Sequence, residues 1–286
     1  ISGSDFSTFS NIVSGQTLSA TGSGTVSSAN VGTGKNVTSV NLALANGTGA
    51  ASNYSINSMT AEITGRPVTI SGSRLYDSTT TASSSILTIT SGVSGESLSL
   101  TGSGVLGAAS AGTQTITNNN TLAIADGSGG LASNYTLSGA TINVTIIPRT
   151  LNVTLSREYD GTTSVSGASL TPTFDSLQGG ETLALSGTGS VSTANVGSSK
   201  AVSLGSIALV AGSGNPSNYS LNSATMNVTQ RVINLDGIRA YDATTNVLSS
   251  DINTFGNIVS GETLTISGTG SVGSNSVAMN KAVTIG

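Results

Sequence analysis

The sequence REYDGTTS, residues 157–164, decides the fold because it returns at regular intervals. It recurs as RLYDSTTT at residues 74–81 and as RAYDATTN at residues 239–246, so that the Tyr-Asp pairs are spaced by 83 and 82 residues. Self-similarity at one fixed, long period is the signature of a tandem repeat architecture. We therefore expect a single structural unit of about 82 residues that is repeated along the chain.

Three further markers follow the same period. Asn-Tyr begins at Asn53, Asn134 and Asn218, and a block like SGETLTISGTGSV begins at residues 14, 94, 179 and 260. Arginines recur in pairs, at Arg66 and Arg74, Arg149 and Arg157, and Arg231 and Arg239. These markers place a partial first repeat at 1–65, complete repeats at 66–148 and 149–230, and a partial fourth repeat at 231–286.

The phase of the repeat indicates a piece of a longer polypeptide. SDFSTFSNIVSG at residues 4–15 matches SDINTFGNIVSG at residues 250–261, and the chain begins at Ile1 rather than at a methionine. We expect about 3.5 repeats, beginning and ending inside a unit.

Apolar and polar residues alternate with a period of two, as in half-buried strands. Leu151, Val153 and Leu155 share one face of such a segment. After each Asn-Tyr the alternation slips by one residue: Tyr135 and Leu137 are in phase, and Ala140 resumes late. A slip at a fixed place predicts a β-bulge or tight turn. The fold class that we predict is all-β, a tandem array of small β-sandwich-like repeats joined end to end.

A continuous β-helix is the alternative architecture. Its rungs would show a sequence period of roughly 20 residues, much shorter than the period of the four markers.

Composition excludes several classes of function. Charged residues are 8% of the chain, aromatic residues are 3%, the net charge is −4, and there is no cysteine or histidine. Nucleic-acid binding requires clustered Lys and Arg, disulfides and thiolate metal sites require Cys, and no apolar run reaches the roughly 18 residues of a membrane span. Without a His base, a Cys nucleophile or a dense carboxylate pair, we expect neither an enzyme nor a cofactor.

The Tyr-Asp pairs are interpreted as structural turns. An Asp carboxylate can accept hydrogen bonds from backbone N–H groups one or two residues on, while the Tyr ring packs and its hydroxyl finds a partner. Calcium binding is the alternative, but calcium takes 6–8 oxygen ligands and acidic residues are sparse here. The residues of this predicted turn motif are Tyr76, Asp77, Tyr159, Asp160, Tyr241 and Asp242.

Two other recurring features have simple structural interpretations. Gly-rich runs near Gly22, Gly102, Gly187 and Gly268 lack the following helix and the Gly-Lys-Ser/Thr of a phosphate loop, so they predict hairpin turns. Lysines stand at equivalent places, with Gln114 in the second repeat. They predict an exposed residue that guards an edge strand, or, as a minor alternative, a Lys–Asn isopeptide crosslink. These lysines are Lys35, Lys200 and Lys281.

Asn-x-Ser/Thr sequons are numerous, as expected by chance in a chain rich in these residues, and glycosylation at them is a minority hypothesis. The candidate sites are Asn36, Asn46, Asn53, Asn119, Asn134, Asn143, Asn152, Asn218 and Asn227.

The Tyr-Asp blocks, together with ANVGSSKAV at residues 194–202 and GNPSNYSLNSATMNV at residues 214–228, resemble the YDG repeats of large Gram-negative surface proteins. Such repeats occur in adhesins of the filamentous-haemagglutinin type. The resemblance covers essentially the whole chain, although only the third repeat has a literal Tyr-Asp-Gly. It implies an exported, repetitive protein of the cell surface, and it supplies no catalytic residues.

Two functions follow as expectations. The first is a structural or adhesive stalk segment of a long extracellular protein, because repetition without chemical variety suits a spacer. Its partners would be neighbouring repeats of the same chain and, laterally, other copies through exposed strand edges. The second is a carbohydrate- or host-binding adhesin module, which would require aromatic platforms that this chain has in small number.

Overall fold

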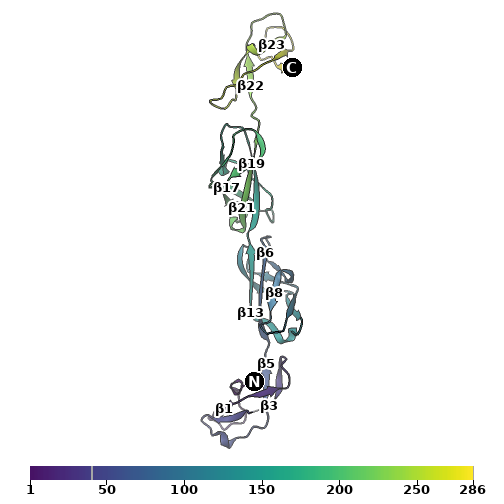
Figure 1. Ribbon diagram of the computed structural model, residues 1–286, viewed down its shortest axis with the longest axis vertical. Helices are drawn as coiled ribbons and strands as arrows, with labels where there is room; N and C mark the ends of the chain where they lie inside the picture. The colour runs from purple at the N-terminus through teal and green to yellow at the C-terminus, as the bar shows by residue number, and fades with distance from the viewer. Residues whose placement is uncertain (40, 286) are drawn as a thin grey trace. The chain divides into compact units, whose positions relative to one another are not determined.

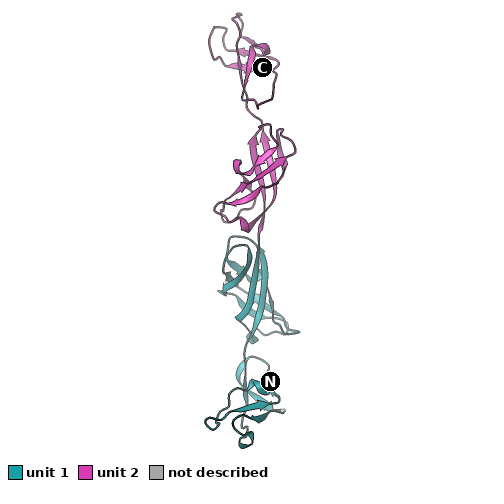
Figure 2. Ribbon diagram, turned by 90° about the vertical axis from the view of Figure 1, so that its left-hand side faces the viewer, with its two compact units in different colours: residues 1–147 teal, residues 148–286 magenta. Residues whose placement is uncertain are grey.

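The computed structural model describes residues 1–39 and 41–285. The chain forms two compact units, residues 1–147 and 148–286, which Figure 2 shows in different colours. Within the described residues the regular structure is β-strand and short 3-10 turns, with no α-helix. The all-β prediction is therefore confirmed.

The repeat at residues 149–230 contains eight strands in two sheets. The larger sheet has the strand order β15-β18-β19-β21-β14-β16, and β17 pairs with β20 in the smaller one. The strands are β14 (Arg149–Glu158), β15 (Ser164–Ser166), β16 (Thr173–Phe174), β17 (Leu183–Ser186), β18 (Thr188–Val191), β19 (Gly197–Ser203), β20 (Ala208–Ala211) and β21 (Tyr219–Thr229).

The repeat at residues 66–148 has the same arrangement. Its sheets have the orders β7-β10-β11-β13-β6-β8 and β12-β9, which match those of the following repeat strand for strand. The tandem repeat is thus a repeat of structure as well as of sequence. The strands are β6 (Arg66–Leu75), β7 (Thr81–Ser83), β8 (Leu87–Thr90), β9 (Leu98–Thr101), β10 (Ser103–Leu106), β11 (Gly112–Asn118), β12 (Ala123–Asp126) and β13 (Tyr135–Ile147).

The two partial repeats retain parts of this pattern. In the first, β1 (Leu18–Thr21) pairs with β4 (Ala43–Asn46), and β2 (Gly24–Val26), β3 (Gly32–Ser39) and β5 (Thr60–Ile63) form a second sheet. In the fourth, β22 (Asn234–Gly237) pairs with β24 (Ile252–Gly256), beside a sheet of β23 (Asn246–Leu248), β25 (Thr269–Val272) and β26 (Val283–Ile285). The 3-10 turns are η1 (Gly3–Asp5), η2 (Ala51–Asn53), η3 (Ser84–Ile86), η4 (Ala132–Asn134), η5 (Gly167–Ser169), η6 (Pro216–Asn218) and η7 (Ser249–Asp251).

The first and last strands of each complete repeat run parallel, side by side. β14 pairs with β21 from Arg149↔Tyr219 to Glu158↔Thr229, and β6 pairs with β13 in the same way (Figure 1). The register shifts between Leu151 and Asn152 in one pair, and between Thr136 and Thr141 in the other. The predicted slip after Asn-Tyr is therefore confirmed. Because the pair is parallel, the chain enters a repeat at one end of it and leaves at the other.

Within the larger sheet, β19 pairs with a different strand along each part of its length. β19 pairs with β21 up to Ala201, and its next residues, Val202 and Ser203, pair with β18. Side chains of β14 and β21 pack with those of β17 and β18 in one buried cluster, which contains no tryptophan. Leu151, Leu155 and Met226 are fully buried, and each such side chain contributes roughly 1.5–3 kcal/mol to stability. Aliphatic burial thus supports the repeat, as the low aromatic content requires.

The hairpin-turn prediction for the Gly-rich runs is wrong. Gly187 separates β17 from β18, but β17 pairs with β20 and β18 pairs with β15 and β19. The glycine therefore marks the point where the chain leaves one sheet for the other. Its φ is +79°, and a Cβ there would stand 2.1 Å from the Ser206 carbonyl oxygen. Gly102 repeats both features with a φ of +76° and a 2.0 Å approach to the Thr121 oxygen, so only glycine fits.

The lysine predictions also need correction. Lys200 lies on β19, which has a neighbouring strand on each side, so it does not guard an edge. Its half-buried ammonium donates to the Thr193 hydroxyl at 2.8 Å and to the Asn195 carbonyl at 2.5 Å. Gln114 donates to the Ser110 carbonyl at 3.0 Å in the same way. The long side chain at this position therefore makes hydrogen bonds that stabilise the preceding loop.

Candidate functional site

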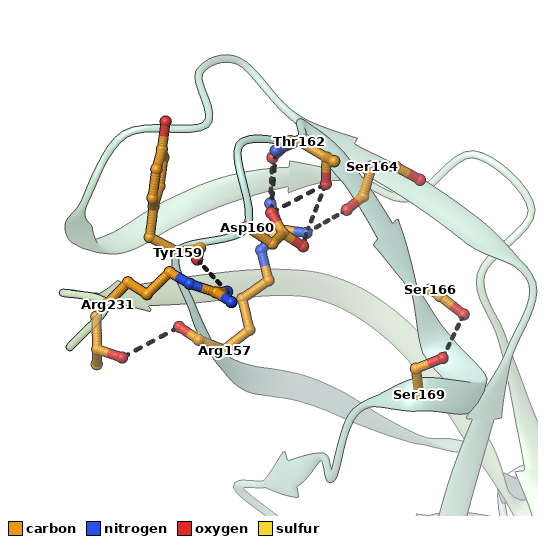
Figure 3. A network of polar contacts seen from close by, with 9 residues as sticks. Arg157, Tyr159, Asp160, Thr162, Ser164, Ser166, Ser169 and Arg231 are labelled. Atoms are coloured by element: carbon orange, nitrogen blue, oxygen red, sulfur yellow. Dashed lines mark hydrogen bonds and ion pairs between the residues drawn. The ribbon is translucent and has the colours of Figure 1, made fainter. Parts of the chain in front are cut away.

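The Tyr-Asp turn is built around one carboxylate. Asp160 accepts two hydrogen bonds from Thr162, one from its backbone N–H and one from its hydroxyl, both at 3.0 Å. Figure 3 shows the carboxylate between Thr162 and Arg157. A side-chain oxygen that accepts from the N–H two residues on defines an Asx-turn. The turn joins β14 to β15.

The same geometry recurs in the other copies of the motif. Asp77 accepts from the N–H and hydroxyl of Thr79 at 2.9 Å each, and Asp242 accepts from Thr244 at the same distances. The residue between them is left-handed in every copy, with φ values of +64° at Ser78, +75° at Gly161 and +65° at Ala243. A glycine adopts this conformation without strain, which explains the third letter of the Tyr-Asp-Gly sequence.

An arginine completes the turn, and sequence reasoning missed its role. The Arg157 guanidinium lies 3.1 Å from the Asp160 carboxylate, donates to the Ser164 carbonyl at 2.5 Å, and donates to the Thr162 carbonyl. Its side chain is only 10% exposed. Arg239 pairs with Asp242 at 2.7 Å and donates to the Thr244 carbonyl at 2.7 Å. Arg74 pairs with Asp77 likewise. The sequence did contain a signal for this role, because an Arg stands three residues before the Asp of every Tyr-Asp pair.

Two of the three carboxylates are stabilised in their charged form. Partial burial raises the pKa of Asp77, but hydrogen bonds from Thr79 and Arg74 outweigh it, so the pKa lies below its ordinary value. The pKa of Asp242 is lowered first by the Thr244 N–H and then by the Thr244 hydroxyl. Both carboxylates therefore stay charged as hydrogen-bond acceptors of the turn at neutral pH.

The turn lies at the end of the repeat from which the chain leaves. The Tyr159 N–H donates to the Thr229 carbonyl at 3.0 Å, where β21 ends, and the Tyr76 N–H donates to the Ile147 carbonyl at 2.9 Å, where β13 ends. Tyr76 is buried, whereas Tyr241 is 65% exposed. The described part of the fourth repeat contains no equivalent of β21.

Tyr159 reaches beyond its own repeat. Its hydroxyl donates to the Glu262 carboxylate, and this bond, more than burial, raises the Tyr159 pKa. Arg231 donates to the Tyr159 carbonyl at 3.3 Å, as Figure 3 shows. The carboxylate of Glu158 lies 3.8 Å from Arg231. The turn therefore contacts the residues that open the following repeat.

A second set of tyrosines, those of Asn-Tyr, binds the acidic residue of the Ser-Gly-Glu block. Tyr219 donates to Glu181 at 2.5 Å, and Tyr135 donates to Glu96. In the first repeat Tyr54 donates to Gln16 at 2.5 Å. Burial and then the bond to Glu181 raise the Tyr219 pKa. The two members of each pair are 38 or 39 residues apart in sequence. Only their recurrence with the period of the repeat could have suggested that they are in contact.

The sequons differ in their accessibility. Asn218 is 4% exposed, so a glycan on its amide does not fit the folded repeat, and this candidate site is withdrawn. Asn134 and Asn227 are half-buried, and each makes a hydrogen bond through its amide oxygen, to Val31 and Ser199 respectively. The remaining candidates are exposed, namely Asn36, Asn46, Asn53, Asn119, Asn143 and Asn152.

In residues 1–39 and 41–285, no group of three or more His, Cys, Asp or Glu side chains is placed to hold a metal ion. The same residues contain no helical segment with the length and apolar character that a bilayer crossing demands.

Comparison with known proteins identifies the repeat. A family model described as the YDG domain matches the chain three times in tandem, at residues 1–61, 62–143 and 145–226. No curated protein and no solved structure matches the chain.

Proposed function

Because the chain belongs to the YDG domain family, we propose that it is a stalk or fibre segment of a long extracellular bacterial surface protein, with a structural or adhesive role. The observation that carries the proposal is the parallel pairing of the first and last strands in each complete repeat. A repeat with entry and exit at opposite ends advances the chain by about its own length. Reach then grows with the number of repeats.

The short connections between consecutive repeats support a spacer in which rotation between repeats is limited. β13 ends at Ile147 and β14 begins at Arg149, so that only Pro148 separates two complete repeats. Between β21 and β22 the connection runs from residue 230 to residue 233. Proline fixes its own φ and restricts the residue before it. Such short connections oppose the free rotation that long Gly/Ser linkers permit.

The cell-surface location rests on the resemblance of the blocks at residues 74–81, 157–164 and 239–246 to repeats of filamentous-haemagglutinin-type adhesins. The composition is consistent with this location. A neutral surface with 8% charged residues and a net charge of −4 suits a solvated spacer better than a nucleic-acid or anionic-membrane partner. The proposal assigns the chain neither a catalytic role nor a cofactor.

A carbohydrate- or host-binding module is the second candidate, and the groove between β11 and β13 does not support it. A groove of about 390 Å³ lies between β11 and β13 and is lined by Thr, Ile, Asn, Leu and Ala side chains. Among these lining residues none is aromatic, although an aromatic face is the usual platform for a sugar ring. A glycan array probed with the 286-residue chain would favour this candidate if one sugar class bound specifically.

Electron microscopy of the intact parent protein on cells tests the stalk. We expect surface fibres that shorten in steps when one or two whole repeats, such as residues 66–148 or 149–230, are deleted in frame. An intact fibre length after deletion, or a parent protein that does not reach the cell surface, would refute the proposal.

A further inference from the structure

Several residues of the recurring motifs contact a neighbouring repeat, at the Tyr159 junction and at the Asn134 junction. Arg231 is the clearest case. Its guanidinium donates to the Tyr159 carbonyl at 3.3 Å in the preceding repeat. It also donates to the backbone and side-chain oxygens of Asn257 at 2.6 and 2.7 Å in its own repeat. Arg231 therefore bridges the Tyr-Asp turn and the segment of residues 257–262, here termed the Ser-Gly-Glu loop.

Tyr159 contacts the same loop through its side chain. Its hydroxyl donates to Glu262 at the end of the loop. Beside it, a Cβ placed on Gly161 would stand 2.7 Å from the Val259 Cγ1 atom. The Asx-turn itself accepts a larger residue, because Ser78 and Ala243 hold the same left-handed position in other copies. Close contact with the loop is thus a second reason for glycine at this position.

An independent contact joins the first two repeats. The side chain of Asn134, from Asn-Tyr, accepts from the Val31 N–H at 2.9 Å and donates to the Asn30 amide oxygen at 3.0 Å. These residues are more than 100 positions apart in sequence and lie in consecutive repeats. The neighbouring Tyr135 donates to Glu96 of its own Ser-Gly-Glu block. The Asn-Tyr pair therefore connects the preceding repeat to that block.

We propose that these motif residues form an inter-repeat clamp, whose partner is the next YDG repeat. Tyr159 and Arg231 hold the Ser-Gly-Glu loop at one junction, and Asn134 holds residues 30 and 31 at another. The clamp restricts the rotation of the two repeats that meet at each of these two junctions. This inference rests on the proposed stalk function and names the contacts that give the stalk its stiffness.

The recurrence of residue types distinguishes the clamp from incidental contacts. Arginine opens each repeat, at Arg66, Arg149 and Arg231, and the Ser-Gly-Glu acid recurs at Glu96, Glu181 and Glu262. Arg66 also lies against its own block, with its Nη2 atom 3.1 Å from the Cβ position of Gly92. By contrast, Glu158 is replaced by Leu75 and Ala240, so its exposed 3.8 Å ion pair with Arg231 is peripheral.

The absence of cysteine permits a direct test, because two introduced cysteines can be labelled without a background. Ser198→Cys and Ser250→Cys place spin labels on exposed positions on either side of the Tyr159 junction. Pulsed electron–electron double resonance measures the distance between the two labels, and on the 286-residue chain it should give one narrow distance distribution. Tyr159→Phe, Glu262→Gln and Arg231→Gln should each broaden it, while Tyr241→Phe, at the exposed equivalent tyrosine, should not.

A second pair of labels, at Ser19→Cys and Ser73→Cys, tests the Asn134 junction. Asn134→Ala should broaden that distribution, and Asn119→Ala, at an exposed asparagine of the same repeat, should leave it narrow. A broad wild-type distribution, or distributions that the clamp variants leave narrow, would overturn the inference.

An alkaline titration of tyrosine absorbance provides a readout that does not depend on the labels. The chain has six Tyr and no Trp. Glu262→Gln should move the transition of one tyrosine to lower pH, and an unchanged titration would count against the Tyr159–Glu262 contact. The fibre-deletion experiment is separate: if fibres shorten while the distances are broad, the stalk remains and only the clamp fails. Narrow distances without any fibre would leave the clamp and refute the stalk.

Discussion

Arg157 and Asp160 form an ion pair of 3.1 Å across the turn that gives the repeat its most recognisable sequence. The arginine also donates to two carbonyl groups of the same turn, those of Thr162 and Ser164. The carboxylate meanwhile accepts both donors of Thr162. Backbone polar groups that β14 and β15 leave unpaired are thus satisfied by two side chains three residues apart.

Replacement of the carboxylate measures the strength of the turn. Asp160→Ala removes two hydrogen bonds to Thr162 and leaves Arg157, a largely buried cation, without its counter-ion. We expect the free energy of unfolding to fall by about 1–2 kcal/mol, as is usual for such bonds. Urea denaturation followed by circular dichroism measures this, with Asp236→Ala, at an exposed strand position, as a control that should change little. Equal effects of the two variants would argue that the turn does not depend on its carboxylate.

Metal removal distinguishes the turn from a calcium site. The Asp160 oxygens are already engaged by Thr162 and Arg157, whereas calcium takes 6–8 oxygen ligands. We therefore expect the same melting temperature in EDTA and in excess calcium chloride. A melting temperature several degrees higher in calcium would establish the calcium alternative.

Two glycines of one repeat allow the cost of a left-handed backbone to be measured apart from the cost of a steric clash. Gly187 and Gly180 both have positive φ, +79° and +71°, but only Gly187 faces a carbonyl, which a Cβ would approach to 2.1 Å. Gly180→Ala should cost about 1 kcal/mol, the usual cost of a left-handed alanine. Gly187→Ala should cost about 3 kcal/mol, because the backbone must also shift. Thermal melts of both variants measure these costs. Similar losses of stability would contradict the close packing of Gly187 where the chain passes from one sheet to the other.

Acid should weaken the turn of the second repeat. Because the folded-state pKa of Asp77 lies below its ordinary value of 3.8, its contribution to stability is complete above that value and is lost as the pH falls through the lower folded value. Asp77→Asn should therefore be less stable than wild type at neutral pH, and the difference should narrow below about pH 4. Urea denaturation at several pH values measures the difference. A constant difference at every pH would show that the charge of Asp77 does not contribute.

Local features of the fold could be predicted from sequence. The alternation of Leu151, Val153 and Leu155 identified a strand, and the slip after Tyr135 identified an irregularity of register, because both depend on residues close in the chain. The tandem architecture could also be predicted, because the repeat period is found by comparing segments of the sequence with one another.

Partners distant in sequence could not be predicted. The crossing at Gly187 resembled a hairpin because β17 and β18 are adjacent, whereas β17 pairs with β20, more than twenty residues later. The pairing of Tyr219 with Glu181 depends on the fold in the same way, as does the burial of Asn218. The Arg157–Asp160 pair was within reach, since its spacing is local and recurs, but the arginines were treated only as markers of the period.

We propose that consecutive repeats stabilise one another and so act together as a stalk. A repeat of about 82 residues buries a smaller share of its surface than a larger domain does, and neighbour contacts add to stability in repeat proteins. The most direct measurement compares the thermal unfolding of residues 149–230 alone with that of residues 66–286. If the repeats stabilise one another, the longer chain should have a clearly higher melting temperature and unfold in one cooperative transition. Equal melting temperatures would contradict it and would leave a flexible string of independent domains.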